Sequence, residues 1–160
     1  MDTTVRQIQK KDNASLAVII RNALKEFGAD KPGTVYYDES TDHLFELFQQ
    51  PNAVYYAAVQ GNTVLGGAGI YPTDGLPEDT CELVKMYLAP AARGKGLAKL
   101  LMNFCLKTAK EKGFTKVYIE TMPELAAAIG MYEKFGFTYL QKPLGNSGHN
   151  GCSTWMLRLL

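Results

Sequence analysis

The segment from Glu82 to Lys112 constrains the fold most, because it reads as a strand that passes through a short turn directly into a long helix. The helical part has apolar residues at the three- and four-residue spacing of one buried face, namely Leu97, Leu100, Leu101 and Phe104. Gly113 follows, at the position where glycine commonly ends a helix. The turn therefore lies at the amino end of a well-defined helix.

The turn has the sequence RGKGLA, beginning at Arg93, and leaves several backbone N–H groups unpaired at the positive end of the helix dipole. Gly94 and Gly96 allow an anion to approach the backbone, while Arg93 and Lys95 add positive charge. The turn thus predicts a phosphate or pyrophosphate site. It matches neither a dinucleotide fingerprint, which needs a small residue at Lys99, nor a P-loop, which ends in Gly-Lys-Ser/Thr.

The remaining periodicity predicts an α/β (or α+β) fold in which helices cover both faces of a mixed sheet. Strands are expected at residues 5–8, 53–59, 64–71, 80–88, 116–121, 137–140 and 154–159, and helices at 13–27, 97–112 and 123–135. A further short helix should be capped at Ser40 or Thr41. Strand alternation predicts that Glu82, Val84 and Met86 share one face of their strand. With 160 residues, 46% of them hydrophobic, residues 1–160 fit a single domain.

Composition excludes several classes of protein. A net charge of +1 disfavours nucleic acid and anionic membrane surfaces as partners, and no apolar run approaches the roughly 18 residues of a membrane span. Cys81, Cys105 and Cys152 form an odd set without CxxC spacing, so we expect neither a disulfide framework nor a metal site. The cytoplasm is the expected location.

Two sequence blocks then resemble the GNAT superfamily of N-acetyltransferases. The first is an R/Q-x-x-G-x-G/A signature, found here as Arg93, Gly96 and Ala98, five residues after a strand that ends at Leu88. The second is a strand followed by a helix ending in A-x-x-L-Y-E-K-x-G-F, matched by Ala128, Met131, Tyr132, Glu133, Lys134, Gly136 and Phe137.

The resemblance implies a mostly antiparallel sheet of six to seven strands in which one parallel pair splays apart. It implies acetyl-coenzyme A as cosubstrate, with its pantetheine arm along the backbone of a splayed strand and its pyrophosphate on the turn. The cofactor-binding residues expected from it are Met86, Tyr87, Leu88, Arg93, Gly94, Lys95, Gly96, Leu97, Ala98 and Lys99.

The resemblance also assigns catalytic roles. Tyr132 is the expected general acid, since a positioned phenol can protonate a leaving thiolate at neutral pH. Glu82 and Glu120 lie at positions where different relatives carry a general base; we favour Glu82, although either carboxylate could simply pair with a lysine. Many relatives have an asparagine seven residues before the tyrosine, where this chain has Leu125.

The acceptor is expected to be a primary amine of a small molecule or amino acid, bound near Phe27, Tyr36, Tyr37, Tyr71 and His149, in a monomer or a homodimer. Two alternatives differ in chemistry. A cysteine nucleophile at Cys152 activated by His149 is one, although it leaves the anion turn unexplained. A non-catalytic acyl-coenzyme A sensor is the other.

Overall fold

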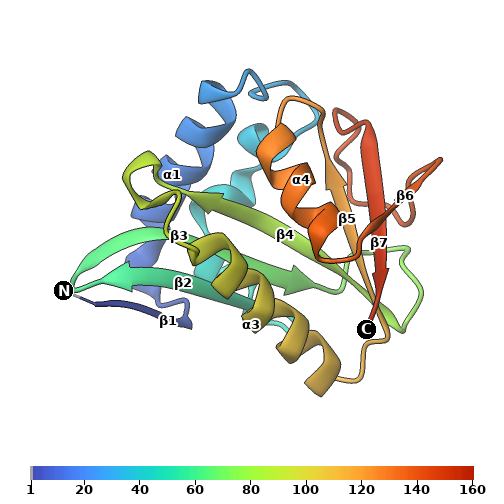
Figure 1. Cartoon of the computed structure of the whole chain (residues 1–160), viewed down its shortest axis with the longest axis horizontal. Coiled ribbons are helices and arrows are strands. Elements are labelled where there is room, and N and C mark those ends of the chain that lie inside the picture. The colour runs from blue at the N-terminus through green and yellow to red at the C-terminus, as the bar shows by residue number, and fades with distance from the viewer. Residues whose placement is uncertain (1) are drawn as a thin grey trace.

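The computed structural model describes residues 2–160 and contains an open mixed sheet (Figure 1). Within these residues the strands lie in the order β1-β2-β3-β4-β5-β7-β6. The elements are β1 (Thr3–Gln7), α1 (Asn13–Glu26), α2 (Leu44–Leu47), β2 (Val54–Gln60), β3 (Thr63–Tyr71), β4 (Thr80–Leu88), α3 (Leu97–Glu111), β5 (Lys116–Thr121), α4 (Ala126–Lys134), β6 (Thr138–Leu140) and β7 (Thr154–Leu159). The fold class and the strand order along the chain expected from the sequence are confirmed.

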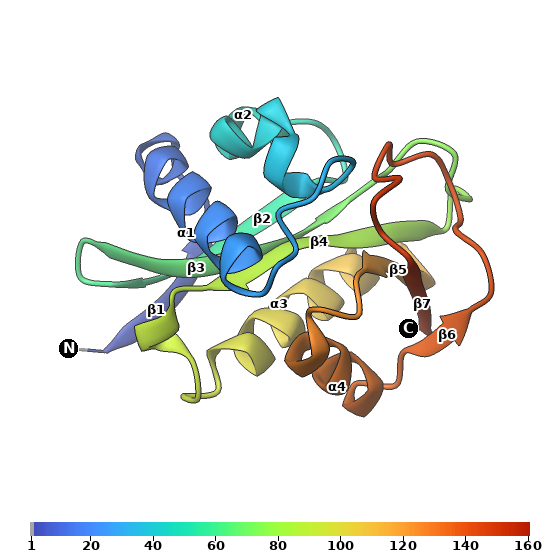
Figure 2. The ribbon, with the colours of Figure 1, turned by 90° about the horizontal axis from the view of Figure 1, so that it is seen from above.

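Helices cover both faces of the sheet, with α1 and α2 on one side and α3 and α4 on the other (Figure 2). The α1 side is filled by Leu16, Ile20 and Leu24, which pack with Phe48 and Tyr55. The α3 side is filled by Leu101, Met102 and Cys105 of α3 together with strand residues such as Val117 and Ile119. Because α1 and α3 each carry apolar residues on one face, they form two separate cores, one on each side of the sheet. Among the described residues, no helix has the length and apolar character needed to cross a membrane.

Two predicted helix boundaries are wrong. The short helix α2 begins after His43 and has no side-chain cap, because the hydroxyl of Thr41 donates instead to the carbonyl of Val35 at 2.9 Å. Helix α4 begins at Ala126 rather than at residue 123, since a turn closed by the bond from the Leu125 N–H to the Met122 carbonyl precedes it.

Strands β4 and β5 form a parallel pair that separates after three residues. Their register runs from Thr80 opposite Lys116 to Glu82 opposite Tyr118, whereas β4 continues to Leu88. Beyond Glu82, β5 therefore no longer pairs with this edge of β4. The splay implied by the family resemblance is present, and it opens the sheet beside the turn at the amino end of α3.

Strand β4 also contains a β-bulge. Gly67 pairs with Tyr87 and Gly69 with Val84, so three residues advance on β4 while two advance on β3. Lys85 lies within the bulge and has a left-handed φ of 53°. Such an insertion changes which way the following side chains point.

The bulge overturns the expected alternation. Val84 and Tyr87 pack on the α1 side of the sheet, whereas Leu83 and Met86 pack on the α3 side. Val84 and Met86 therefore lie on opposite faces, not on one face as a regular strand would require. Lys85 lies where this alternation breaks, in the irregular part of the strand.

Candidate active site

The turn before α3 is open to an anion. Gly94 and Gly96 have φ angles of +76° and +80°, and a Cβ added to either would meet no atom within 4 Å. Within residues 2–160, the backbone N–H groups of residues 94–99 donate no hydrogen bond, since the first helical bond runs from the Leu100 N–H to the Gly96 carbonyl. This arrangement supplies free donors at the amino end of a 15-residue helix.

The guanidinium of Arg93 already has partners within the chain. It donates to both carboxylate oxygens of Glu26 at 2.8 and 3.1 Å and to the Leu88 carbonyl at 3.0 and 3.2 Å. It also lies 5.1 Å from the ring centroid of Phe27. The guanidinium thus joins the end of α1 to the turn. The side chain of Lys95 is exposed to solvent.

A cavity of about 400 Å³ runs from this turn along the splayed strands. Every predicted cofactor-binding residue except Lys95 lines it. Leu125, which stands where relatives have asparagine, lines it as well, together with Ala127 and Ala128 of α4. The cavity therefore links the open anion turn to the side chains of α4 and β5.

Tyr132 projects from α4 into this cavity. It is 7% exposed, and its ring centroid lies 6.0 Å from that of Phe137. Burial, and to a smaller extent the neighbouring Cys105, raises the pKa of the Tyr132 phenol above its usual value of 10. The hydroxyl is therefore protonated at neutral pH and can act as a proton donor.

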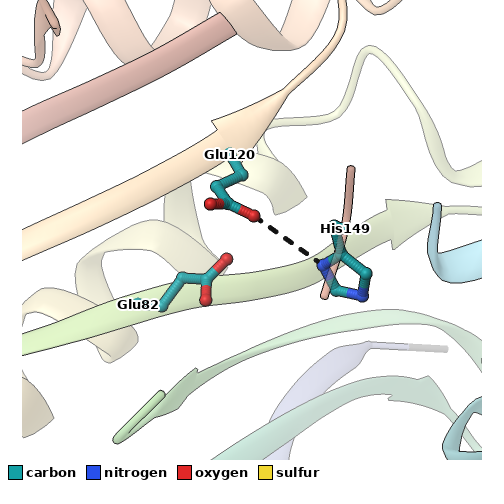
Figure 3. A group of neighbouring side chains, drawn as sticks. All are labelled: Glu82, Glu120 and His149. Atoms are coloured by element: carbon teal, nitrogen blue, oxygen red, sulfur yellow. Dashed lines mark ion pairs between the residues drawn. The ribbon is translucent and has the colours of Figure 1, made fainter. Parts of the chain in front are cut away.

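Glu82, Glu120 and His149 converge at the other end of the cavity (Figure 3). Glu82 comes from β4, Glu120 from β5 and His149 from the loop between β6 and β7, and one ligand atom of each lies within 4.8 Å of the others. A carboxylate oxygen of Glu120 lies 3.9 Å from Nδ1 of His149. Two carboxylates and an imidazole could in principle hold a metal ion; the expectation of no metal stays a prediction.

Glu82 has the properties of a base that works near neutral pH. It is 3% exposed, and burial together with the charge of Glu120 raises the pKa of Glu82 from 4.5 to about 7. The hydroxyl of Thr73 donates to one of its oxygens at 2.6 Å and partly opposes this shift. Glu82 is therefore a buried carboxyl group that can be either protonated or ionised at physiological pH.

Glu120 is held by hydroxyl groups. The phenol of Tyr118 donates to one oxygen at 2.7 Å, and Ser147 donates to the other. The backbone N–H of Leu144 in turn donates to the Tyr118 oxygen at 3.0 Å. Glu120 therefore fixes the loop between β6 and β7 against β5, and both of its oxygens already accept hydrogen bonds.

His149 is paired with Asp38 from the loop that follows α1. Their Nε2 and Oδ2 atoms lie 2.6 Å apart. Burial favours neutral His149, but the bond to Asp38 and its charge outweigh burial and raise the pKa of His149 above 6.5. Burial likewise opposes ionisation of Asp38, while His149 and Lys85 together hold its pKa below 3.8.

Neither Asp38 nor Lys85 is assigned a role by sequence reasoning. Lys85 could have been suspected, because it interrupts an otherwise apolar strand end. Asp38 carries no local signal, since it meets His149 across 111 residues of chain.

A second cavity, of about 260 Å³, lies on the other side of the acidic cluster. Glu82, Lys85 and His149 line both cavities. Tyr71 lines the second one, as expected of an acceptor residue, with Thr73, Asn146 and Ser147 as polar neighbours; the further lining residues are Ser40, Leu47, Gln50, Pro72, Asp74 and Val84.

The other predicted acceptor residues lie elsewhere. Phe27 lines the first cavity beneath Arg93, and neither Tyr36 nor Tyr37 lines either of these two cavities. Tyr36 instead packs edge-on against Tyr37, with ring centroids 5.1 Å apart, and its carbonyl accepts a bond from Arg21.

The geometry disfavours a cysteine nucleophile. His149 uses one ring nitrogen for Asp38 and turns the other toward Glu120, so neither nitrogen bonds the thiol of Cys152. Burial and the surrounding carboxylates raise the pKa of that thiol to about 12. Cys152 is consequently a neutral thiol in the cavity wall.

Sequence comparisons relate this chain to one family of known proteins. A family model described as the acetyltransferase (GNAT) family matches residues 20–137. YjgM of Escherichia coli strain K12, an uncharacterized N-acetyltransferase, is 42% identical over 158 residues, which cover 98% of this chain and 94% of that protein.

Solved structures agree in fold. A GNAT-family acetyltransferase from Staphylococcus aureus Mu50 matches with a TM-score of 0.83 at 15% identity, over 99% of both chains. The PaiA N-acetyltransferase of Thermoplasma acidophilum, solved in complex with coenzyme A, matches with a TM-score of 0.77 at 19% identity, over 100% of both chains.

The family match spans most of the sheet and both motif blocks, and the E. coli relative extends it over nearly the whole chain. The family and the enzyme class that the two sequence blocks predict are thereby confirmed. The chain belongs to the acetyltransferase (GNAT) family.

Proposed function

We propose that this protein transfers an acetyl group from acetyl-coenzyme A to the primary amine of a small molecule, by direct attack of the amine in a ternary complex. One observation supports this most strongly. A single cavity has free backbone donors at one end and, farther along, a buried phenol and two carboxylates.

The residues of the cavity suit acetyl-coenzyme A. The open space over Gly94 and Gly96 admits a pyrophosphate, whose charge the helix end and Lys99 would balance. The unpaired edge of β4 offers backbone groups to a pantetheine arm. When bound there, acetyl-coenzyme A supplies an electrophilic thioester carbon and a thiolate leaving group.

Glu82 and Tyr132 then carry out different proton transfers. Glu82 accepts a proton from the acceptor ammonium, and the freed amine nitrogen forms a bond to the thioester carbon as the carbon–sulfur bond breaks. Tyr132 gives its proton to the departing thiolate sulfur, and the second proton that the nitrogen loses on becoming an amide returns to the Tyr132 phenolate. The products are the N-acetylated acceptor and coenzyme A, with the proton from the ammonium left on Glu82 for release to solvent.

Glu82 is a better candidate for the base than Glu120. It lines both cavities and has a pKa of about 7, close to the value that makes a base effective at neutral pH. Both oxygens of Glu120 already accept hydrogen bonds from Tyr118 and Ser147. Glu120 therefore acts through Glu82, as a positioning residue that raises its pKa.

A small acceptor is favoured over an extended protein tail. The loop between β6 and β7 contributes Asn146, Ser147 and His149 to the wall of the second cavity, which at about 260 Å³ is smaller than most pockets for drug-sized ligands.

The test is release of free coenzyme A thiol from acetyl-coenzyme A in the presence of a panel of primary amines. We expect turnover with the wild type and a loss of about 100-fold in kcat for Tyr132→Phe, which keeps the ring and removes the donor. Binding of acetyl-coenzyme A, followed by calorimetry, should change little in that variant. Tight binding without turnover of any amine, unchanged by Tyr132→Phe, would instead identify an acyl-coenzyme A sensor.

A further inference from the structure

Lys85 is held rigidly in an unusual place. Its backbone has a φ of 53° within the β4 bulge, and its carbonyl accepts a 2.7 Å bond from the hydroxyl of Tyr55. The ring of Tyr55 fits there because Gly67 lacks a side chain: a Cβ on Gly67 would lie 2.4 Å from Cε1 of that ring. The packing of Tyr55 thus fixes the backbone conformation that orients the side chain of Lys85.

The ammonium of Lys85 has unused donors. Its side chain is only 5% exposed, yet among residues 2–160 the sole carboxylate oxygen within 4.0 Å is Oδ2 of Asp38, at 3.6 Å. That distance is too long for a hydrogen bond, and the same oxygen already makes a 2.6 Å bond to His149. An ammonium that has three N–H groups, no hydrogen bond within 3.5 Å in the described chain and a place in the walls of both cavities has donors to offer an anionic ligand.

Glu82 and Lys85 together give the second cavity a particular charge pattern. They lie three positions apart on β4, one a carboxyl group and the other an ammonium, and both line both cavities. A ligand that carries an amine and a carboxylate on one carbon atom would match them in one orientation. The cavity adds neutral polar groups from Gln50, Thr73 and Asn146 that suit the rest of a small polar molecule.

We propose that the acceptor is a free α-amino acid, whose carboxylate binds the ammonium of Lys85 while its amine faces Glu82. This assignment rests on the proposed function and names the acceptor class for it. Lys85 is then a specificity residue, and amines without an adjacent carboxylate are poor acceptors because they leave its donors unpaired.

The experiment compares free amino acids with two matched analogues of each, the carboxamide and the decarboxylated amine. Compared with the amino acid, the amine is less basic in the carboxamide and more basic in the decarboxylated analogue. A preference for the amino acid over both analogues therefore does not come from basicity alone. We expect kcat/KM for the preferred amino acids to exceed that for both analogues by on the order of 10- to 100-fold. In Lys85→Gln the ratio of kcat/KM for the amino acid to kcat/KM for each analogue should fall toward one. Lys85→Arg should keep most of this preference.

A matched control and a second readout separate recognition from folding. Lys107→Gln removes one charge from an exposed position of α3 and should keep the wild-type ratio. With coenzyme A bound, the preferred amino acid should raise the melting temperature of the wild type, and neither analogue should do so. Should Lys85→Gln fail to fold, the wild-type comparison and Lys85→Arg decide the matter.

Equal acetylation of amino acids and their analogues by the wild type overturns the assignment, as does an unchanged ratio in folded Lys85→Gln. In both cases acetyl transfer itself stands. If the wild type binds acetyl-coenzyme A but acetylates no amine of any class, the proposed function falls and the acceptor assignment falls with it.

Discussion

Glu82 shows how burial of one side chain sets a pH dependence. Because its pKa is about 7, the fraction of Glu82 that can accept a proton rises as pH increases through 7. We expect kcat/KM of the wild type to rise along a limb with an apparent pKa near 7. Glu82→Gln should lose that limb and fall by about 10²- to 10⁴-fold below pH 7, with a smaller deficit at high pH where solvent deprotonates the amine.

Glu120 provides the matched comparison, because its charge is one of the causes that raise the pKa of Glu82. Glu120→Gln should therefore move the limb to lower pH without removing it. A pH–rate series for the three proteins distinguishes the two carboxyl groups. If Glu120→Gln abolishes the limb and Glu82→Gln only shifts it, the base is Glu120.

Helix α3 carries left-handed glycines at both ends, which allows strain to be separated from ligand binding. Gly96 has a φ of +80° before its first turn, and Gly113 a φ of +91° after its last, and neither has an atom within 4 Å of an added Cβ. Valine at either position should cost about 1–2 kcal/mol of stability, the usual penalty for an L-residue with this backbone.

Only Gly96→Val should also lose affinity for acetyl-coenzyme A, by at least tenfold, since its side chain would fill the space over the turn. Gly113→Val is the control for stability alone. Calorimetric titration and urea denaturation of both variants give the two quantities. Unchanged affinity in folded Gly96→Val would place the pyrophosphate elsewhere.

Local patterns explain which elements could be predicted. The apolar stripe of α3 and its terminal glycines depend on neighbours three or four residues apart, so the helix and the open turn can be read from the sequence. The bulge at Lys85 could not, because a strand with one extra residue has the same composition as a regular one. Its position depends on the pairing with β3 and on how Gly67 accommodates Tyr55.

Contacts between residues far apart in the chain explain which residues of the site could not be predicted. Glu82, Glu120 and Tyr132 were predicted because they flank recognisable motifs, and all three line one cavity. The partner of His149 was not predicted, because Asp38 comes from a loop at the opposite end of the chain. Arg93 lines the same cavity, and its bond to Glu26 is another contact that no local pattern encodes.

The bond between Asp38 and His149 joins the segment between α1 and α2 to the loop between β6 and β7. A raised His149 pKa means that this bond contributes stability that is fully present below pH 6.5 and is lost as pH rises through the folded-state value. We expect amide hydrogen exchange in residues 141–153, corrected for the intrinsic pH effect, to be faster at pH 9 than at pH 6. Protection of α3 should not change in the same way.

The chain has one other histidine, His43, which serves as the control. His149→Gln should remove the pH dependence of exchange in the loop, and His43→Gln should retain it. If the loop exchanges equally at both pH values in the wild type, the bond does not order it.

The extra residue in β4 also has an evolutionary consequence. In a regular strand of the same length, Glu82 and Tyr87 would point to opposite faces, so the proposed base at Glu82 and the packing of Tyr87 are compatible on one face only because of this one insertion. A single-codon deletion of the extra residue, Lys85, would leave the two positions four residues apart and therefore on one face, but it would remove Lys85 from the walls of both cavities. A one-residue gap between these positions should therefore mark lineages whose acceptor chemistry has diverged.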